Sequence, residues 1–268
     1  MQLYADSVFY NLTLHQADRN LPYLLMFHGF MGSREIFKPL TDDLADFCNP
    51  LTLDLIGHGN TETPDNPELF HAERQIQQLK SVLDRLQFKP LFLFGYSMGG
   101  RLAFQLIARY SDLFAGAIIE SSHCGIPSKA DRINRIEADQ QRAIQIENNF
   151  TDFLKKWQKL PLFAHTPFKA RKRYTEIMKT QKPEMMSASL KGFGAGVMPR
   201  VCQKVYSSRL PLQLIAGERD KKYAEILEQI SGNHTNAKLA VVKNAGHRVH
   251  TDRPEEWIRI VKDFIQTG

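Results

Sequence analysis

Cysteine is scarce in this chain of 268 residues, and long apolar runs are absent from it. The three cysteines, Cys48, Cys124 and Cys202, are widely spaced and include no C-x-x-C pair. This spacing argues against a disulfide framework or a cysteine zinc site, and it predicts reduced thiols in a cytosolic protein. No stretch approaches the roughly 18 apolar residues that a membrane span requires. Residues 1–6 lack the basic and apolar blocks of a secretory signal, so we expect a cytoplasmic protein without integral membrane association.

Charge is only slightly unbalanced, because 35 basic and 29 acidic residues give a formal net charge of +6. The one dense basic cluster, at residues 169–173, has a single aromatic neighbour on each side. This pattern favours a solvated helix face over a nucleic-acid surface. The excess of positive charge is also compatible with a small anionic substrate. No pair of histidines has the H-E-x-x-H spacing of a helical zinc site, so neither a metal nor another cofactor is predicted.

Short apolar segments alternate with longer helical patterns, which is typical of a mostly parallel sheet flanked by helices. Helices are expected at residues 37–47, 70–86, 99–110 and 254–265. Several of the expected strands are continuously apolar, as strands covered on both faces should be. These strands lie at residues 7–15, 23–28, 50–54, 91–95, 115–121, 212–216 and 238–242.

The alternation stops between residues 122 and 209, where the sequence is helical in character. Its apolar residues recur at spacings typical of one amphipathic face: Ile144, Phe150, Phe153, Leu154, Trp157 and Leu160. We interpret residues 122–209 as a helical cap inserted into an α/β core formed by residues 1–121 and 210–268. A cap at the carboxyl edge of the sheet would cover a site there.

The sharpest motif is G-x-S-x-G at residues 95–99, placed after an apolar strand and before a helix. The chain must turn sharply at Ser97, and only small residues two positions before and after it leave room for that turn. The turn lifts the Ser97 hydroxyl above the sheet, with the N-terminus of a helix beneath it. Ser97 is therefore the predicted reactive residue.

A serine hydroxyl is a weak nucleophile and base at neutral pH, and it needs a histidine that a carboxylate orients. In folds with this motif the chain order is serine, acid, histidine. His247 follows the strand at residues 238–242, and Asp220 follows the strand at residues 212–216. Glu218 competes with Asp220 for the acid position, and His250 is an alternative to His247. The spacing favours a triad of Ser97, Asp220 and His247.

An oxyanion hole requires two backbone donors. One is expected to be the N–H of Met98, the residue after Ser97. The other is expected to be the N–H of Phe30, in the glycine-rich loop after the strand at residues 23–28. The alternative for this loop is a plain turn at the end of a strand.

Together these motifs resemble the α/β-hydrolase superfamily over nearly the whole chain. The resemblance rests on the serine motif and on MFHGF at 26–30, DLIGHG at 54–59, GERD at 217–220 and NAGH at 244–247. Further segments are similar to one branch, the 2-succinyl-6-hydroxy-2,4-cyclohexadiene-1-carboxylate synthases (MenH) of menaquinone and phylloquinone biosynthesis. They are Arg101 after the serine motif, WQKLPLF at 157–163, LKGFGAG at 190–196 and DKKY at 220–223.

The resemblance implies a carbon–oxygen lyase that eliminates pyruvate from an enolpyruvyl-substituted cyclohexene bearing three carboxylates. It implies that His247, oriented by Asp220, withdraws the Ser97 proton, so that the serine oxygen acts as a general base. A trianionic substrate requires several cationic side chains, because a buried carboxylate without a partner is costly. The expected partner is this small tricarboxylate, and the protein is expected to be a monomer or a weak homo-oligomer.

The resemblance also implies which side chains bind the substrate. Arg101 lies one helical turn after Ser97 and would lean over the pocket, and Arg135 matches a cap arginine of the family. Where the family has a further cap arginine, this chain has Lys179, with Arg173 as an alternative. The aromatic walls of the pocket are expected to be Tyr96 and Trp157, although either could be core packing.

Two other functions use the same residues. A carboxylesterase or thioesterase would use Ser97 as a nucleophile in a mostly apolar pocket. A non-catalytic ligand-binding protein on the same scaffold would not need an intact triad.

Overall fold

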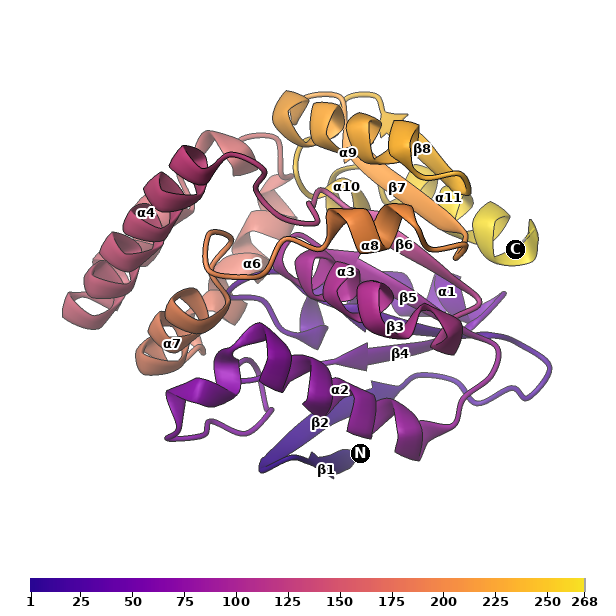
Figure 1. Cartoon of the computed structure of the whole chain (residues 1–268), viewed down its shortest axis with the longest axis horizontal. Coiled ribbons are helices and arrows are strands. Elements are labelled where there is room, and N and C mark those ends of the chain that lie inside the picture. The colour runs from indigo at the N-terminus through magenta and orange to yellow at the C-terminus, as the bar shows by residue number, and fades with distance from the viewer. Residues whose placement is uncertain (268) are drawn as a thin grey trace.

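The computed structural model describes residues 1–267, and its centre is an eight-stranded sheet (Figure 1). The spatial order of the strands is β1-β2-β4-β3-β5-β6-β7-β8. The first two pairings are antiparallel, and every pairing from β4 to β8 is parallel. The strands are β1 (Gln2–Ala5), β2 (Val8–Leu14), β3 (Tyr23–Phe27), β4 (Asn49–Leu53), β5 (Leu91–Tyr96), β6 (Gly116–Glu120), β7 (Leu212–Gly217) and β8 (Ala237–Val242).

Helices cover both faces of this sheet, which explains why its central strands are apolar throughout. In Figure 1, α2 (Ala72–Leu86), α3 (Met98–Tyr110) and α9 (Lys221–Asn233) lie on the near face. The far face carries α1 (Thr41–Ala45) and α11 (Pro254–Thr267). On that face Trp257 of α11 packs edge-on against Phe94 of β5, with ring centroids 5.1 Å apart. Every residue of β4, β5, β6 and β7 is buried as a result.

A helical region is inserted between β6 and β7, as the sequence predicted. It contains α4 (Lys129–Asn148), α5 (Phe150–Trp157), α6 (Phe168–Lys179), α7 (Pro183–Phe193) and α8 (Cys202–Tyr206). Between β6 and β7 the described chain forms no strand. Figure 1 shows α4, α6 and α7 to one side of the sheet. The domain limits at residues 122 and 209 stay a prediction.

The expectation of three reduced cysteines was wrong. Cys124, in the loop after β6, forms a disulfide with Cys202 at the start of α8, and their Cα atoms are 4.9 Å apart. The N–H of Val201 also donates to the Cys124 carbonyl at 2.8 Å, so the two segments run together. The pairing was missed because the cysteines are 78 residues apart in sequence, and spacing alone does not bring them together. Cys48 is a buried free thiol.

The single amphipathic face expected in the insertion is divided between two helices. The helix breaks at Asn149, whose side chain accepts a hydrogen bond from the N–H of Asp152 at 2.9 Å and so caps α5. Phe153 and Leu154 of α5 are buried, whereas Ile144 of α4 is 44% exposed. Across residues 1–267, the helices are too short or too polar to cross a membrane.

Candidate active site

Ser97 lies at the sharp turn between β5 and α3. Its backbone has φ 52° and ψ −109°, a left-handed value that strains a residue with a side chain. The turn is crowded, because a Cβ on Gly99 would lie 2.5 Å from the Phe27 carbonyl oxygen. The Ser97 carbonyl accepts from the Arg101 N–H at 3.0 Å and from the Ser122 hydroxyl at 2.8 Å. Small neighbours and these hydrogen bonds together hold the strained turn.

The loops after β7 and β8 bring Asp220 and His247 to Ser97. The Nδ1 atom of His247 is 2.6 Å from Oδ2 of Asp220, and its Nε2 atom is 3.0 Å from the Ser97 hydroxyl oxygen. Both the histidine and the aspartate are buried. Because a carboxylate only accepts, Nδ1–H donates to Asp220, and Nε2 is then free to accept the serine proton.

The two competing residues lie elsewhere. Glu218 is exposed, and its carboxylate accepts from the backbone N–H of Asn244 at 3.1 Å. His250 instead has its Nδ1 atom 2.7 Å from a carboxylate oxygen of Glu120, in a fully buried pair. Neither is hydrogen-bonded to a member of the predicted triad.

The loop after β3 lies against the serine turn. A Cβ on Gly29 would lie 2.7 Å from a ring carbon of Tyr96 and 3.5 Å from the Ser97 Cβ, so glycine allows this close approach. Phe30 of this loop and Met98, the first residue of α3, both line the cavity around Ser97. Their positions suit two backbone donors, and that role stays a prediction.

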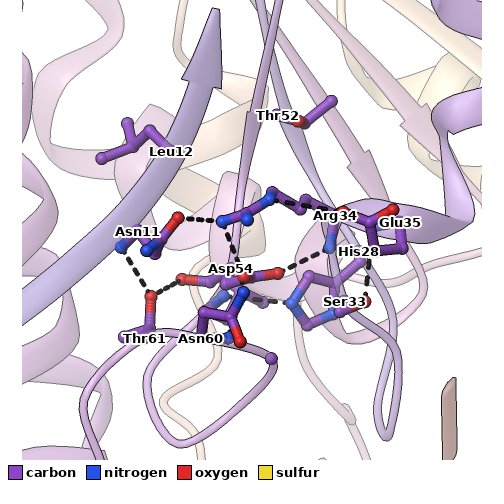
Figure 2. Close-up of polar contacts among 12 residues, drawn as sticks. Asn11, Leu12, His28, Ser33, Arg34, Glu35, Thr52, Asp54, Asn60 and Thr61 are labelled. Carbon is purple, nitrogen blue, oxygen red and sulfur yellow. Dashed lines mark hydrogen bonds and ion pairs between the residues drawn. The ribbon is translucent and has the colours of Figure 1, made fainter. Parts of the chain in front are cut away.

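A buried polar network holds the same loop to the one after β4 (Figure 2). The Asp54 carboxylate accepts from the backbone N–H groups of Arg34 at 2.7 Å and Asn60 at 3.0 Å, and it pairs with the Arg34 guanidinium at 3.1 Å. Burial raises the pKa of Asp54, and these donors oppose that effect. Burial also lowers the pKa of His28 to about 4, so its neutral ring accepts the Leu55 N–H at 3.0 Å. The base of the loop that carries Phe30 is thus fixed.

The cavity around Ser97 has a volume of about 210 Å³ and is rich in cations. Of its described lining residues, one is a carboxylate, Asp139. The cationic side chains that line it are Arg101, Arg135, Arg142, Lys222 and Arg248. The cavity therefore favours an anionic occupant.

Arg101 and Arg135 both reach this cavity, as predicted. Arg101 is 7% exposed and donates to the Phe193 carbonyl at 3.1 Å. Burial, together with the nearby charge of Arg135, lowers the pKa of Arg101 to about 10. Nε of Arg135 donates to Asp139 at 2.8 Å, and the same carboxylate accepts from Arg142 at 2.7 Å.

The two predicted aromatic residues line the cavity, whereas the predicted lysine does not. Tyr96 is buried beside His247, with ring centroids 5.5 Å apart, and Trp157 packs edge-on against Phe30 at 5.6 Å. Both residues line the cavity. The expectation for Lys179 was wrong: it does not line the cavity, and its 59% exposed side chain pairs with Glu176 at 2.9 Å. Lys179 lies in the last turn of α6, where its long side chain extends into solvent.

Four charged residues of the cavity were missed from the sequence: Asp139, Arg142, Lys222 and Arg248. Asp139 lies four residues after Arg135 and three before Arg142 and pairs with both, a signal that was present once a helix was placed there. Lys222 follows Asp220 closely in a stretch whose helix, α9, was not predicted. Arg248 directly follows His247, and no local pattern distinguishes it.

Comparisons with known proteins agree with this architecture. Residues 24–260 match the model of a family described as the alpha/beta hydrolase family. A Bacillus subtilis protein, provisionally named 2-succinyl-6-hydroxy-2,4-cyclohexadiene-1-carboxylate synthase, is 30% identical over 242 residues, covering 89% of this chain and 88% of its own. The synthase of that name from Salmonella paratyphi B is 26% identical over 234 residues, covering 87% and 89%. The solved structure of MenH from S. aureus has a TM-score of 0.89 at 26% identity, covering 96% of this chain and 98% of that one. Because the family match spans most of its length, this chain belongs to the alpha/beta hydrolase family.

Proposed function

We propose that this protein is a 2-succinyl-6-hydroxy-2,4-cyclohexadiene-1-carboxylate synthase. In that reaction pyruvate is eliminated from 2-succinyl-5-enolpyruvyl-6-hydroxy-3-cyclohexene-1-carboxylate, a step of menaquinone and phylloquinone biosynthesis. The proposal is supported by the relatives of that name, which align with almost the whole chain. The observation that carries it is the cationic cavity beside the Ser97–His247 pair.

A cationic cavity is what a substrate with three carboxylates requires. Carboxylates leave water at a high energetic cost unless guanidinium or ammonium groups replace their hydration. Arg101 and Arg135 are the proposed substrate contacts, and Tyr96 and Trp157 the proposed aromatic walls. An esterase pocket for neutral substrates would not need five cationic side chains around its serine.

The proposed mechanism uses the serine as a base. His247, held by Asp220, accepts the Ser97 proton, and the serine oxygen removes a proton from the ring carbon beside the succinyl carbonyl. The electron pair of that C–H bond moves onto the carbonyl oxygen, where the N–H groups of Phe30 and Met98 stabilise the enolate. The pair then returns to form a double bond between C2 and C3 of the ring, the existing C3–C4 double bond shifts to C4–C5, and the C5–O bond to the enolpyruvyl group breaks. The leaving group is protonated and becomes pyruvate, so no acyl-enzyme forms.

Pyruvate release tests this proposal directly. Purified protein is mixed with the enolpyruvyl substrate, and pyruvate is measured by coupled reduction with lactate dehydrogenase and NADH. We expect turnover by the wild-type protein and a loss of about 10³-fold or more in Ser97→Ala, as for other activated serines. A wild-type protein that releases no pyruvate would refute the proposal.

Two further measurements separate the alternatives. Strong cleavage of p-nitrophenyl esters without pyruvate release identifies an esterase, and tight ligand binding without either reaction identifies a binding protein. Mass spectrometry of the protein during turnover tests the base mechanism. A substrate-derived adduct on Ser97 that forms and decays with turnover contradicts it.

A further inference from the structure

Arg248 is a buried cation at the active-site cavity without a carboxylate partner. It directly follows His247, lines the cavity and is 5% exposed. Within residues 1–267, no carboxylate oxygen lies within the 4.0 Å of an ion pair with its guanidinium. Its Nε–H group is buried and has no hydrogen-bond partner. In contrast, Arg135 and Arg142 of the same cavity are both paired with Asp139.

Two aromatic rings hold the Arg248 guanidinium. Its central carbon is 4.0 Å from the ring centroid of Phe163 and 3.8 Å from that of Tyr174. Contacts of this kind contribute about 2 kcal/mol when desolvated, but they satisfy none of the N–H groups. A guanidinium packed on rings offers its N–H groups at the edge of its plane, where a carboxylate binds with two parallel hydrogen bonds.

The Tyr174 ring is itself held in place from behind. Its hydroxyl oxygen is 2.8 Å from Nε2 of His250, whose Nδ1 is 2.7 Å from Oε1 of Glu120. The glutamate and histidine are fully buried, and the tyrosine is nearly so. The Glu120 carboxylate accepts from Nδ1–H of His250, and the other ring nitrogen is hydrogen-bonded to the Tyr174 hydroxyl. This chain of hydrogen bonds fixes the ring on which Arg248 packs.

Arg248 is separate from the other cations of the cavity. Arg101 lies over the Phe193 ring at 5.4 Å and Arg135 pairs with Asp139, and both arginines oppose the rise that burial causes in the pKa of Tyr223. Arg248 opposes the rise that burial causes in the pKa of a different tyrosine, Tyr96. The cavity thus has one cationic position around Arg101 and Arg135 and another at Arg248, where no carboxylate oxygen of residues 1–267 lies within 4.0 Å of the guanidinium. A substrate whose carboxylates are well separated would contact both positions.

We propose that Arg248 binds a carboxylate of the substrate. The sequence suggested Lys179 for this role. This inference rests on the proposed function, because it assumes an occupant with several carboxylates. The chemistry shared by the candidate groups is a carboxylate, carried either by the ring–succinyl portion or by the departing pyruvate. Arg248 acts here by binding and positioning, and no proton leaves its guanidinium.

Steady-state kinetics of Arg248→Met, Arg248→Lys and a control variant test the inference. Methionine retains apolar packing against the rings but removes the charge, so KM should rise about 10- to 100-fold, as expected for a charged hydrogen bond. Lysine keeps the charge without the planar fork, and its KM should lie in between. Arg253→Met changes an exposed arginine five residues away and should leave KM within about twofold.

Thermal unfolding without ligand separates binding from a structural role. Arg248→Met loses the two ring contacts but also removes an unpaired buried charge, and these effects oppose each other, so Tm should change by less than about 5 °C. Raised KM with a Tm that is raised, unchanged or lowered by less than about 5 °C supports the inference. An unchanged KM overturns it, and so does a raised KM that comes with a Tm lowered by about 5 °C or more.

Product inhibition and a binding probe complete the test. If Arg248 binds the pyruvate-derived carboxylate, Arg248→Met should weaken inhibition by pyruvate about 10-fold or more; if it binds the ring–succinyl portion, inhibition by succinate should weaken instead. Unweakened inhibition by both overturns the inference. Should the wild-type protein release no pyruvate, stabilisation by propane-1,2,3-tricarboxylate still measures carboxylate binding. Stabilisation that Arg248→Met abolishes then supports the inference although the proposed function fails, and stabilisation that persists, or is absent from the wild-type protein, overturns it.

Discussion

Asp220→Asn is the most demanding test of the proposed proton transfer. The amide has the shape of the carboxylate, but its N–H donates a hydrogen bond to Nδ1 of His247, 2.6 Å away in the wild-type pair, so the histidine carries its proton on Nε2 instead. Nε2 then faces the Ser97 hydroxyl, 3.0 Å away, without a lone pair to accept from it. Restoring the productive tautomer leaves two buried donors facing each other, at a cost of about 1–3 kcal/mol.

A second cost arises when His247 becomes charged. The wild-type carboxylate stabilises the imidazolium by about 4 kcal/mol, for charges about 4 Å apart at an effective dielectric constant of about 20. The two costs sum to about 5–7 kcal/mol, so kcat for pyruvate release should fall about 10⁴-fold or more. KM should change little, since the charge lost lies behind the histidine.

The assay needs a matched control and a folding check. Glu218→Gln makes the same chemical change two residues away, on an exposed carboxylate, and should keep kcat within about twofold. Circular dichroism of both variants establishes that they fold. A folded Asp220→Asn protein with more than about a tenth of wild-type kcat would refute the relay from aspartate through histidine to serine.

Three further predictions follow from the surroundings of the site. Arg101→Met should raise KM about 10- to 100-fold, because it removes a buried charge that would bind a substrate carboxylate, and an unchanged KM would contradict this. Changing both Cys124 and Cys202 to serine should lower the free energy of unfolding by about 2–4 kcal/mol in urea titrations, and equal stability would show that the disulfide does not form. Burial lowers the pKa of His123 to about 3, so an unfolded chain with an ordinary histidine pKa binds the extra proton and stability falls as pH drops below about 6.5. Between pH 7 and pH 5 this histidine should account for about 2 kcal/mol of that loss, which His123→Asn should remove; an identical pH dependence in the variant would exclude the effect.

The sequence predicted those elements whose structure depends on residues close to one another in the chain. The continuous apolar runs of β3 and β5 follow from burial on both faces, and the strained turn at Ser97 requires its two flanking glycines. Strands at the edge of the sheet were harder to predict from the sequence. β1 lies at one edge of the sheet and has one buried residue, Ala5, so its sequence carries no strand periodicity.

Arg248 escaped prediction because its contacts are with residues distant in sequence. Its guanidinium is held at the cavity by the rings of Phe163 and Tyr174, which belong to the inserted region. Lys179 occupied the expected place in the sequence, but the direction of its side chain depends on how α6 packs. Residue order can indicate which loops meet at the edge of a sheet, whereas the choice among several basic residues requires the packed helices.

The hydrogen bond between Tyr174 and His250 has a consequence for how substrate enters. Lifting α6 away from the sheet would break the hydrogen bond between the Tyr174 hydroxyl and His250, both of which are buried. Each abandoned group would cost about 1–3 kcal/mol, which makes a hinged opening at this helix rare. Entry that leaves this contact intact avoids that cost, so we expect α6 to keep its place against the sheet when substrate enters.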